Sequence, residues 1–186
     1  MDAFVTSFTL IFTSEMGDKS QLISIAFTNL YKIRTVLISV FFAALINNGL
    51  AVLFGSLITD HIPLYNIKLL AGILFLYFGI SALLKNNNEN EKIKNSSLGP
   101  IATIVSTYVF SEFGDKTQLA AIALTATYCN PFYILLGTTL GIFSADVIGI
   151  IIGNYFNKKL PINIIKYISS FIFILFGIST IYKLLF

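Results

Sequence analysis

The chain carries one acidic motif twice, as Ser14-Glu-Met-Gly-Asp-Lys-Ser-Gln-Leu22 and as Ser111-Glu-Phe-Gly-Asp-Lys-Thr-Gln-Leu119, each time inside a long apolar stretch. Of its 186 residues, 56% are hydrophobic and 11% are charged, whereas about a quarter of the residues in a soluble domain are charged. This composition is typical of a membrane protein. The formal net charge of +3 is small and lies mostly in connecting segments, so it does not indicate nucleic-acid binding.

Six segments approach the length of about 20 mostly apolar residues that a helix needs to cross a bilayer. Polar clusters that contain Asn and Pro separate these segments. The expected spans are approximately residues 3–28, 35–58, 67–84, 100–127, 132–156 and 162–184. The sequence therefore predicts an all-α membrane protein with six transmembrane helices.

An internal repeat relates the two halves of the chain. When the motifs are aligned and one residue of slippage is allowed, Asn48 meets Asp146 and Gly79 meets Gly177. A unit of three spans crosses the membrane an odd number of times, so the second copy must be inserted upside down relative to the first. We therefore expect two inverted-topology three-helix repeats.

The expected domain boundaries follow from this repeat. Residues 1–85 form the first three-helix repeat, residues 99–186 form the second, and the Asn-rich segment 86–98 is a solvated linker. Most basic residues outside the motifs fall in the first, third and fifth loops, so the positive-inside rule places the linker in the cytoplasm and both termini outside. The first residues lack the basic region of a cleaved signal peptide, so we expect the first span in the mature protein.

The charged residues of the motifs are expected at mid-membrane. At about 1.5 Å of rise per residue, Glu15 and Glu112 lie half-way along their spans, near the centre of a hydrocarbon core about 30 Å thick. Asn48 and Asp146 come out equally deep. Because one charged side chain costs about 2.5–3.5 kcal/mol at this depth, these groups must face one another or a wet cavity.

Carboxylate, amide and hydroxyl oxygens dominate both motifs. The single Cys129 and the single His61 leave no intrachain disulfide and no zinc-type Cys/His cluster. Oxygen donors suit magnesium, calcium or manganese better than zinc or copper, and two such sets that face each other could enclose one cation. Since a desolvated carboxylate binds protons more readily, the same groups could exchange a cation for protons, which is the chemistry of an antiporter.

The motifs also have a purely structural interpretation. Glu15 and Lys19, like Glu112 and Lys116, are spaced i to i+4 and could form salt bridges that hold helices together. This interpretation leaves Asp18, Asp115 and Asp146 as unpaired buried acids. In a transport site, the two lysines could instead keep the empty site electrostatically balanced.

Two further features bear on a transport site. Asp146 is expected to couple protons, because it is an ionisable acid where the first repeat has the amide of Asn48. Asn48 would support the site, although an interhelical hydrogen bond explains this asparagine equally well. Gly17 and Gly114 are expected hinges where a kink would expose carbonyl oxygens, with close helix packing as the alternative. On an ideal helix, Ser20 points away from the acidic face, so a site that uses its hydroxyl requires a distortion near these glycines.

The doubled motif Glu-x-Gly-Asp-Lys-(Ser/Thr), once per half, resembles that of the GDT family, formerly uncharacterised protein family 0016, and the resemblance covers almost the whole chain. It implies a multi-pass secondary transporter of the bacterial plasma (inner) membrane that exports manganese, or calcium, in exchange for protons. It implies no cofactor. By position, the resemblance assigns the cation ligands to Glu15, Asp18, Ser20, Gln21, Glu112, Asp115, Thr117 and Gln118.

Other functions stay open from the sequence. An acidic central cavity could hold the ammonium group of a basic amino acid, as in a small-solute exporter, and a passive cation channel would use similar ligands. A non-transporting membrane assembly protein would use the motifs for helix association. An enzyme is not expected, because no Ser/His or His/Asp pair lies at membrane depth. The expected partners are divalent cations, protons and the lipid bilayer.

Overall fold

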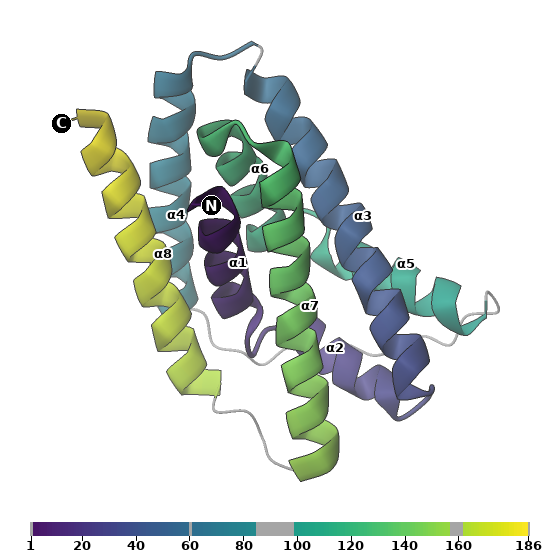
Figure 1. The fold of residues 1–186 in the computed structure, drawn as a ribbon. Helices are drawn as coiled ribbons and strands as arrows, with labels where there is room; N and C mark the ends of the chain where they lie inside the picture. The colour runs from purple at the N-terminus through teal and green to yellow at the C-terminus, as the bar shows by residue number, and fades with distance from the viewer. Residues whose placement is uncertain (1, 60, 85–98, 157–161, 186) are drawn as a thin grey trace.

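The computed structural model describes residues 2–59, 61–84, 99–156 and 162–185, and the regular elements in these ranges are all helices (Figure 1). The predicted all-α class is therefore confirmed. In chain order, the helices are α1 (Asp2–Glu15), α2 (Lys19–Thr28), α3 (Ile33–Thr59), α4 (Leu64–Leu84), α5 (Pro100–Glu112), α6 (Lys116–Tyr128), α7 (Pro131–Phe156) and α8 (Ile162–Leu185). The expected linker, residues 86–98, lies outside the described residues.

The first acidic motif interrupts its own helix. Helix α1 ends at Glu15, and Gly17 follows with a φ of 77°, a left-handed backbone conformation that glycine adopts without steric cost. Asp18 is then the N-cap of α2, and its side chain accepts a hydrogen bond of 2.8 Å from the backbone N–H of Lys19. The N–H groups that open a helix need such acceptors, so the motif both ends one helix and begins the next.

The second motif repeats this break. Helix α5 ends at Glu112, Gly114 also has a φ of 77°, and Asp115 is the extended N-cap of α6. Of the predicted fold, six transmembrane helices in an all-α protein, the all-helical class is confirmed, and the described residues form eight helices. The distortion that the sequence predicts near both glycines is present.

Four of the described helices are long and apolar enough to cross a membrane by length and composition. They are α3, α4 over Leu64–Ser81, α7 over Pro131–Ile152, and α8 over Tyr167–Leu185. The other four have 10 to 14 residues each, fewer than the roughly 20 that a single span requires. Four candidate spans thus accompany two helix pairs, α1–α2 and α5–α6, that are broken at the motifs.

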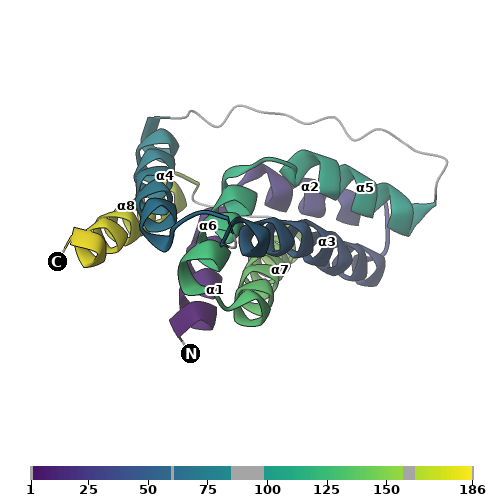
Figure 2. The ribbon, with the colours of Figure 1, turned by 90° about the horizontal axis from the view of Figure 1, so that it is seen from above.

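The two halves of the chain interlock. The most extensive helix contacts, which pair α4 with α8, α1 with α7, and α3 with both α5 and α6, each join the first half to the second. Figure 2 shows the α4–α8 pair on one side of the remaining helices. The acidic motifs, at the breaks of α1–α2 and α5–α6, consequently lie on the seam between the halves.

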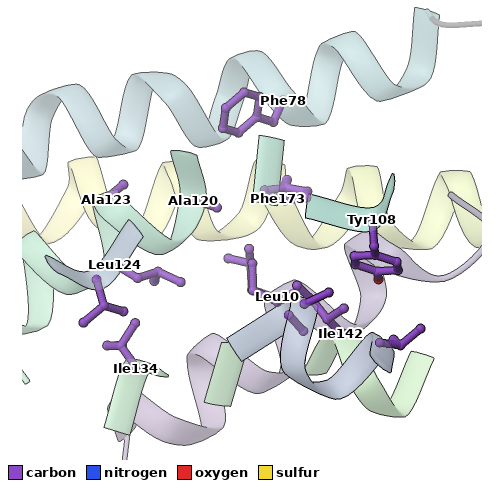
Figure 3. Close-up of a cluster of buried hydrophobic side chains, with 14 of the residues drawn as sticks. Leu10, Phe78, Tyr108, Ala120, Ala123, Leu124, Ile134, Ile142 and Phe173 are labelled. Atoms are coloured by element: carbon purple, nitrogen blue, oxygen red, sulfur yellow. The ribbon is translucent and has the colours of Figure 1, made fainter. Parts of the chain in front are cut away.

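Buried hydrophobic side chains from both halves form a common core (Figure 3). Leu10 of α1, Leu124 of α6 and Ile134 of α7 are buried in it. Large apolar side chains also face outward, and Phe110 is 80% exposed and Leu84 78% exposed. An apolar exterior of this kind suits contact with lipid tails.

Candidate functional site

Carboxylates from the two halves converge where the helix breaks meet. Oxygen atoms of Glu15, Glu112 and Asp115 all lie within 4.8 Å of one another. Glu15 is 1% exposed and Glu112 3% exposed, although they come from segments nearly a hundred residues apart in the chain. Neither half alone contains this cluster.

Several oxygens of the cluster are available to a ligand. Glu15 Oε1, Glu112 Oε2 and Asp115 Oδ2 are buried and accept no hydrogen bond from the part of the chain that the structure describes. Buried polar atoms in native proteins nearly always have a partner, so each orphaned atom calls for an explanation. A hard cation bound between these oxygens would supply the missing partner for all three.

The break at Gly17 brings the motif hydroxyl to the acid. Ser20 Oγ donates a hydrogen bond of 2.6 Å to Glu15 Oε2. On a continuous helix the two side chains would point in nearly opposite directions, and the break between α1 and α2 at Gly17 removes that obstacle. Ser20 thereby holds one oxygen of Glu15 and leaves the other oxygen free.

The glutamines of the motifs brace the two breaks. The backbone N–H of Gly17 donates to Gln21 Oε1 at 2.9 Å, and that of Gly114 donates to Gln118 Oε1 at 2.6 Å. In the first half, Gln21 Nε2 also donates to the backbone carbonyl of Ala145 on α7. This bracing role was not expected from the sequence, where the glutamines were candidates for cation ligands alone.

Helix α7 makes room for Gln21 with a glycine. A Cβ atom at Gly149 would collide with the Cγ, Cδ and Nε2 atoms of Gln21. Because Gln21 stabilises the break through Gly17, the absence of a side chain at Gly149 helps to set the geometry of the acidic cluster from a different helix.

One ion pair crosses between the halves. Lys116 Nζ lies 2.5 Å from Asp18 Oδ2, and the two side chains are 26% and 21% exposed. The structural interpretation that paired Lys116 with Glu112 is corrected, because the break separates these residues into different helices. Within the described ranges, the equivalent partner on the other side, Asp115, keeps a buried oxygen without a hydrogen bond. The site is thus asymmetric.

The remaining predicted residues lie around this centre. Thr117 is buried at the start of α6, in the position equivalent to Ser20, and Lys19 is half-buried at the start of α2. Asn48 on α3 and Asp146 on α7 are each 1% exposed, on helices that contact each other. The structure does not place Asp146 in the three-carboxylate cluster.

Tyr108 is a residue that the sequence interpretation missed. Tyr108 is fully buried (Figure 3), and its hydroxyl donates a hydrogen bond of 2.5 Å to Asp146 Oδ2. The alignment of the motifs pairs Tyr108 with Ile11, so the second half has Tyr and Asp where the first has Ile and Asn. The signal that could have revealed this residue is the tyrosine one turn before Glu112, at a position where the first half has the aliphatic Ile11.

Comparison with known families identifies the family of the chain. The family model described as "Divalent cation/proton antiporter GDT1" matches residues 3–90 and 100–185, which include both acidic motifs. The chain belongs to the GDT1 family. The resemblance drawn from the doubled motif is therefore confirmed, and the acidic cluster lies in a member of a family of membrane cation transporters.

Relatives of this GDT1 chain include bacterial, fungal and chloroplast proteins. A Vibrio cholerae protein named "Putative manganese exporter" is 29% identical over 97% of this chain and 90% of its own length. A GDT1-like protein of Synechocystis sp. is 26% identical over 96% of both chains. The chloroplast protein PAM71 of Arabidopsis thaliana is 27% identical over 96% of this chain and 56% of its own length. No solved structure matches the chain.

Proposed function

We propose that this GDT1 protein is a secondary transporter of the bacterial plasma membrane that exports a divalent cation in exchange for protons. The observation that carries the proposal is the convergence of Glu15, Glu112 and Asp115, whose ligand oxygens lie within 4.8 Å of one another. Manganese is the first candidate substrate, supported by the name of the Vibrio cholerae relative, and calcium is the second. Both cations prefer oxygen ligands.

Cation binding and proton binding compete for the same carboxylates. A carboxylate that is removed from water favours its protonated form unless an opposite charge compensates it. A divalent cation provides that charge and displaces protons, and protons that return from the other side displace the cation. The proposed ligands are the oxygens of Glu15, Asp18, Ser20, Gln21, Glu112, Asp115, Thr117 and Gln118.

Asp146 is proposed to couple the protons. It is fully buried beside Tyr108 and lies outside the three-carboxylate cluster, so it can hold a proton without competing directly for the cation. Lys116 provides a positive charge at Asp18, which balances that carboxylate when no cation is bound. Lys19 would have the corresponding role for the second motif.

The proposed architecture counts each broken helix pair, α1–α2 and α5–α6, as one membrane span. With the four candidate spans, this gives six, arranged as the inverted repeats 1–85 and 99–186. Broken helices at a central site are common in transporters with inverted repeats. Gly17 and Gly114 would be the hinges, and the 86–98 linker would lie in the cytoplasm with both termini outside.

The decisive experiment is manganese uptake into proteoliposomes under an imposed pH gradient. Uptake by the unaltered protein should accelerate as the gradient steepens, whereas a passive channel would be indifferent to it. Loss of groups that merely support metal ligands lowers metal affinity about 10–100-fold, so Glu15→Gln should lower uptake at least about tenfold. Equal uptake by the two proteins would contradict the proposed site.

Two further controls address the other functions. Lysine in place of manganese should not raise the thermal midpoint of the purified protein, which a basic amino acid exporter would require. In an assembly protein, Glu112→Gln would impair folding and leave cellular manganese tolerance intact. The antiporter predicts the reverse, with a folded protein and lost tolerance.

A further inference from the structure

A pocket with polar lining residues lies between α4, α6 and α8, and none of the acidic cluster lines it. It has a volume of about 290 Å³. Its polar lining comes from the first turns of α4 and the last turns of α6 and α8, namely Lys68, Thr127, Tyr128, Ser179, Thr180 and Lys183. These helix ends lie on the same side of the molecule, opposite the start of α3 (Figure 1).

The pocket is a site of positive charge. In the proposed topology, Lys68 and Lys183 are the basic residues at this face, and the other basic residues outside the motifs belong to the opposite face. Both lysines line this one pocket, and no carboxylate lines it. Within the described ranges, neither lysine forms an ion pair. Two ammonium groups that line one pocket without a carboxylate attract an anion.

The two threonine hydroxyls of the pocket are not free to donate to an anion. Thr127 Oγ1 donates to the carbonyl of Ala123 at 2.7 Å, and Thr180 Oγ1 donates to that of Phe176 at 2.8 Å. Because these protons are used within the helices, the hydroxyl oxygens can only accept, which suits them to orient ammonium groups. Each ammonium has three N–H donors, so donors remain for an anion.

The depth of the pocket indicates the source of the anion. Lys68 lies in the second turn of α4 and Lys183 in the last turn of α8, where lysines extend toward the membrane surface. Tyr65 and Tyr182 flank them and are 52% and 63% exposed, and exposed tyrosines mark the level of the lipid headgroups. The pocket therefore lies at the level where lipid phosphates are found.

We propose that this pocket binds the phosphate of an anionic phospholipid headgroup. Basic pockets between transmembrane helices recognise such headgroups on the cytoplasmic side of membranes, and this pocket would use the same charge pairing at the outer face of the proposed topology. Phe176 forms an apolar wall beside the lysines and packs edge-to-face on Phe75 with ring centroids 5.2 Å apart, a surface suited to the glycerol and first methylene groups. The bound lipid would join α4, α6 and α8 at this face.

The test measures the thermal midpoint of the full chain, purified in detergent, with added phosphatidylglycerol, phosphatidylcholine or inorganic phosphate. Saturating phosphatidylglycerol should raise the midpoint by about 5 °C. Phosphatidylcholine and inorganic phosphate should give less than half of this shift. An equal shift with phosphatidylcholine, or with inorganic phosphate, would overturn the assignment to an anionic lipid.

Variants locate the effect. The double substitution Lys68→Gln/Lys183→Gln should abolish the phosphatidylglycerol shift, and Lys68→Arg/Lys183→Arg should retain it. Lys32→Gln/Arg34→Gln is the matched control, since it removes two exposed cations at the start of α3, on the side of the molecule opposite the pocket. This variant should leave the shift unchanged. If the double variant does not fold, Lys183→Gln alone should halve the shift, and a full shift in either glutamine variant would overturn the proposal.

Discussion

At the scale of single residues, Ser20 determines which oxygen of Glu15 can meet a ligand. Its hydroxyl holds Oε2 at 2.6 Å, and Oε1 is the buried atom without a partner in the described ranges. A carboxylate fixed by one hydrogen bond needs less reorganisation to bind a cation than one that rotates freely. The serine of the first motif therefore orients an acid, whether or not it touches the ion itself.

Ser20→Ala should weaken manganese binding without unfolding the protein. A hydrogen bond to a charged group contributes about 1.5–3 kcal/mol, so the manganese concentration for half-maximal uptake in proteoliposomes should rise at least about tenfold. Ser20→Thr should behave like the unaltered chain. Ser39→Ala is the matched control, since Ser39 is equally buried but donates within its own helix to Thr35; an equal effect there would remove the special role of Ser20.

At the scale of elements, the helix break is the main local feature. Gly17 takes a left-handed conformation, Gln21 braces it, and Asp18 begins the next helix. The break places the N-terminus of α2 at the acidic centre, and the positive end of a helix favours nearby negative charge. Breaking the helix thus contributes directly to holding several carboxylates together.

Gly17→Ala should destabilise the break. A side chain in the left-handed region costs about 1–2 kcal/mol, which lowers the thermal midpoint by about 2–8 °C in a chain of this size. Manganese uptake should fall by more than this loss of folded protein explains. Gly49→Ala is the control, because a Cβ atom there meets nothing within 4 Å. Unchanged uptake in Gly17→Ala would show that the break is not needed for transport.

The elements also show how far sequence reasoning reaches. The lengths of the apolar segments, and the clusters with Asn and Pro between them, predict where α3, α4, α7 and α8 lie. The free-energy cost of burying charge predicts that the two motifs meet. The pairing of Lys116 with Asp18 could not be predicted, because i to i+4 geometry assumes the continuous helix that the motif interrupts. Tyr108 was missed because hydrophobic periodicity does not distinguish a tyrosine in the core from one that serves a carboxylate.

At the scale of the whole molecule, the site exists only because the halves interlock. Each half contributes carboxylates to the cluster, and the extensive helix contacts cross from one half to the other. The Lys116–Asp18 ion pair is a polar link across the same seam. Any rearrangement of one half against the other must therefore change this ion pair and the carboxylate cluster together.

Reversing the charges of this ion pair tests the link. Asp18→Lys and Lys116→Asp should each lower the thermal midpoint, because each leaves two like charges side by side. The double variant should recover at least half of the loss, although it should not transport manganese, because a proposed ligand is gone. A double variant as unstable as the sum of the two single variants would contradict a direct contact between the halves.

In the proposed antiporter, the hydrogen bond between Tyr108 and Asp146 would make the two directions of exchange energetically unequal. A carrier built from two identical inverted halves would have two conformations of equal free energy, related by a twofold axis in the membrane plane. Ile11 and Asn48 occupy the corresponding positions of the first half and cannot form this bond, so the two conformations differ in free energy. A difference of about 1.4 kcal/mol gives a tenfold excess of one conformation. In the absence of a gradient, we expect most molecules to have the site open to the same side of the membrane. The transport rate should then differ between gradients of equal size and opposite sign.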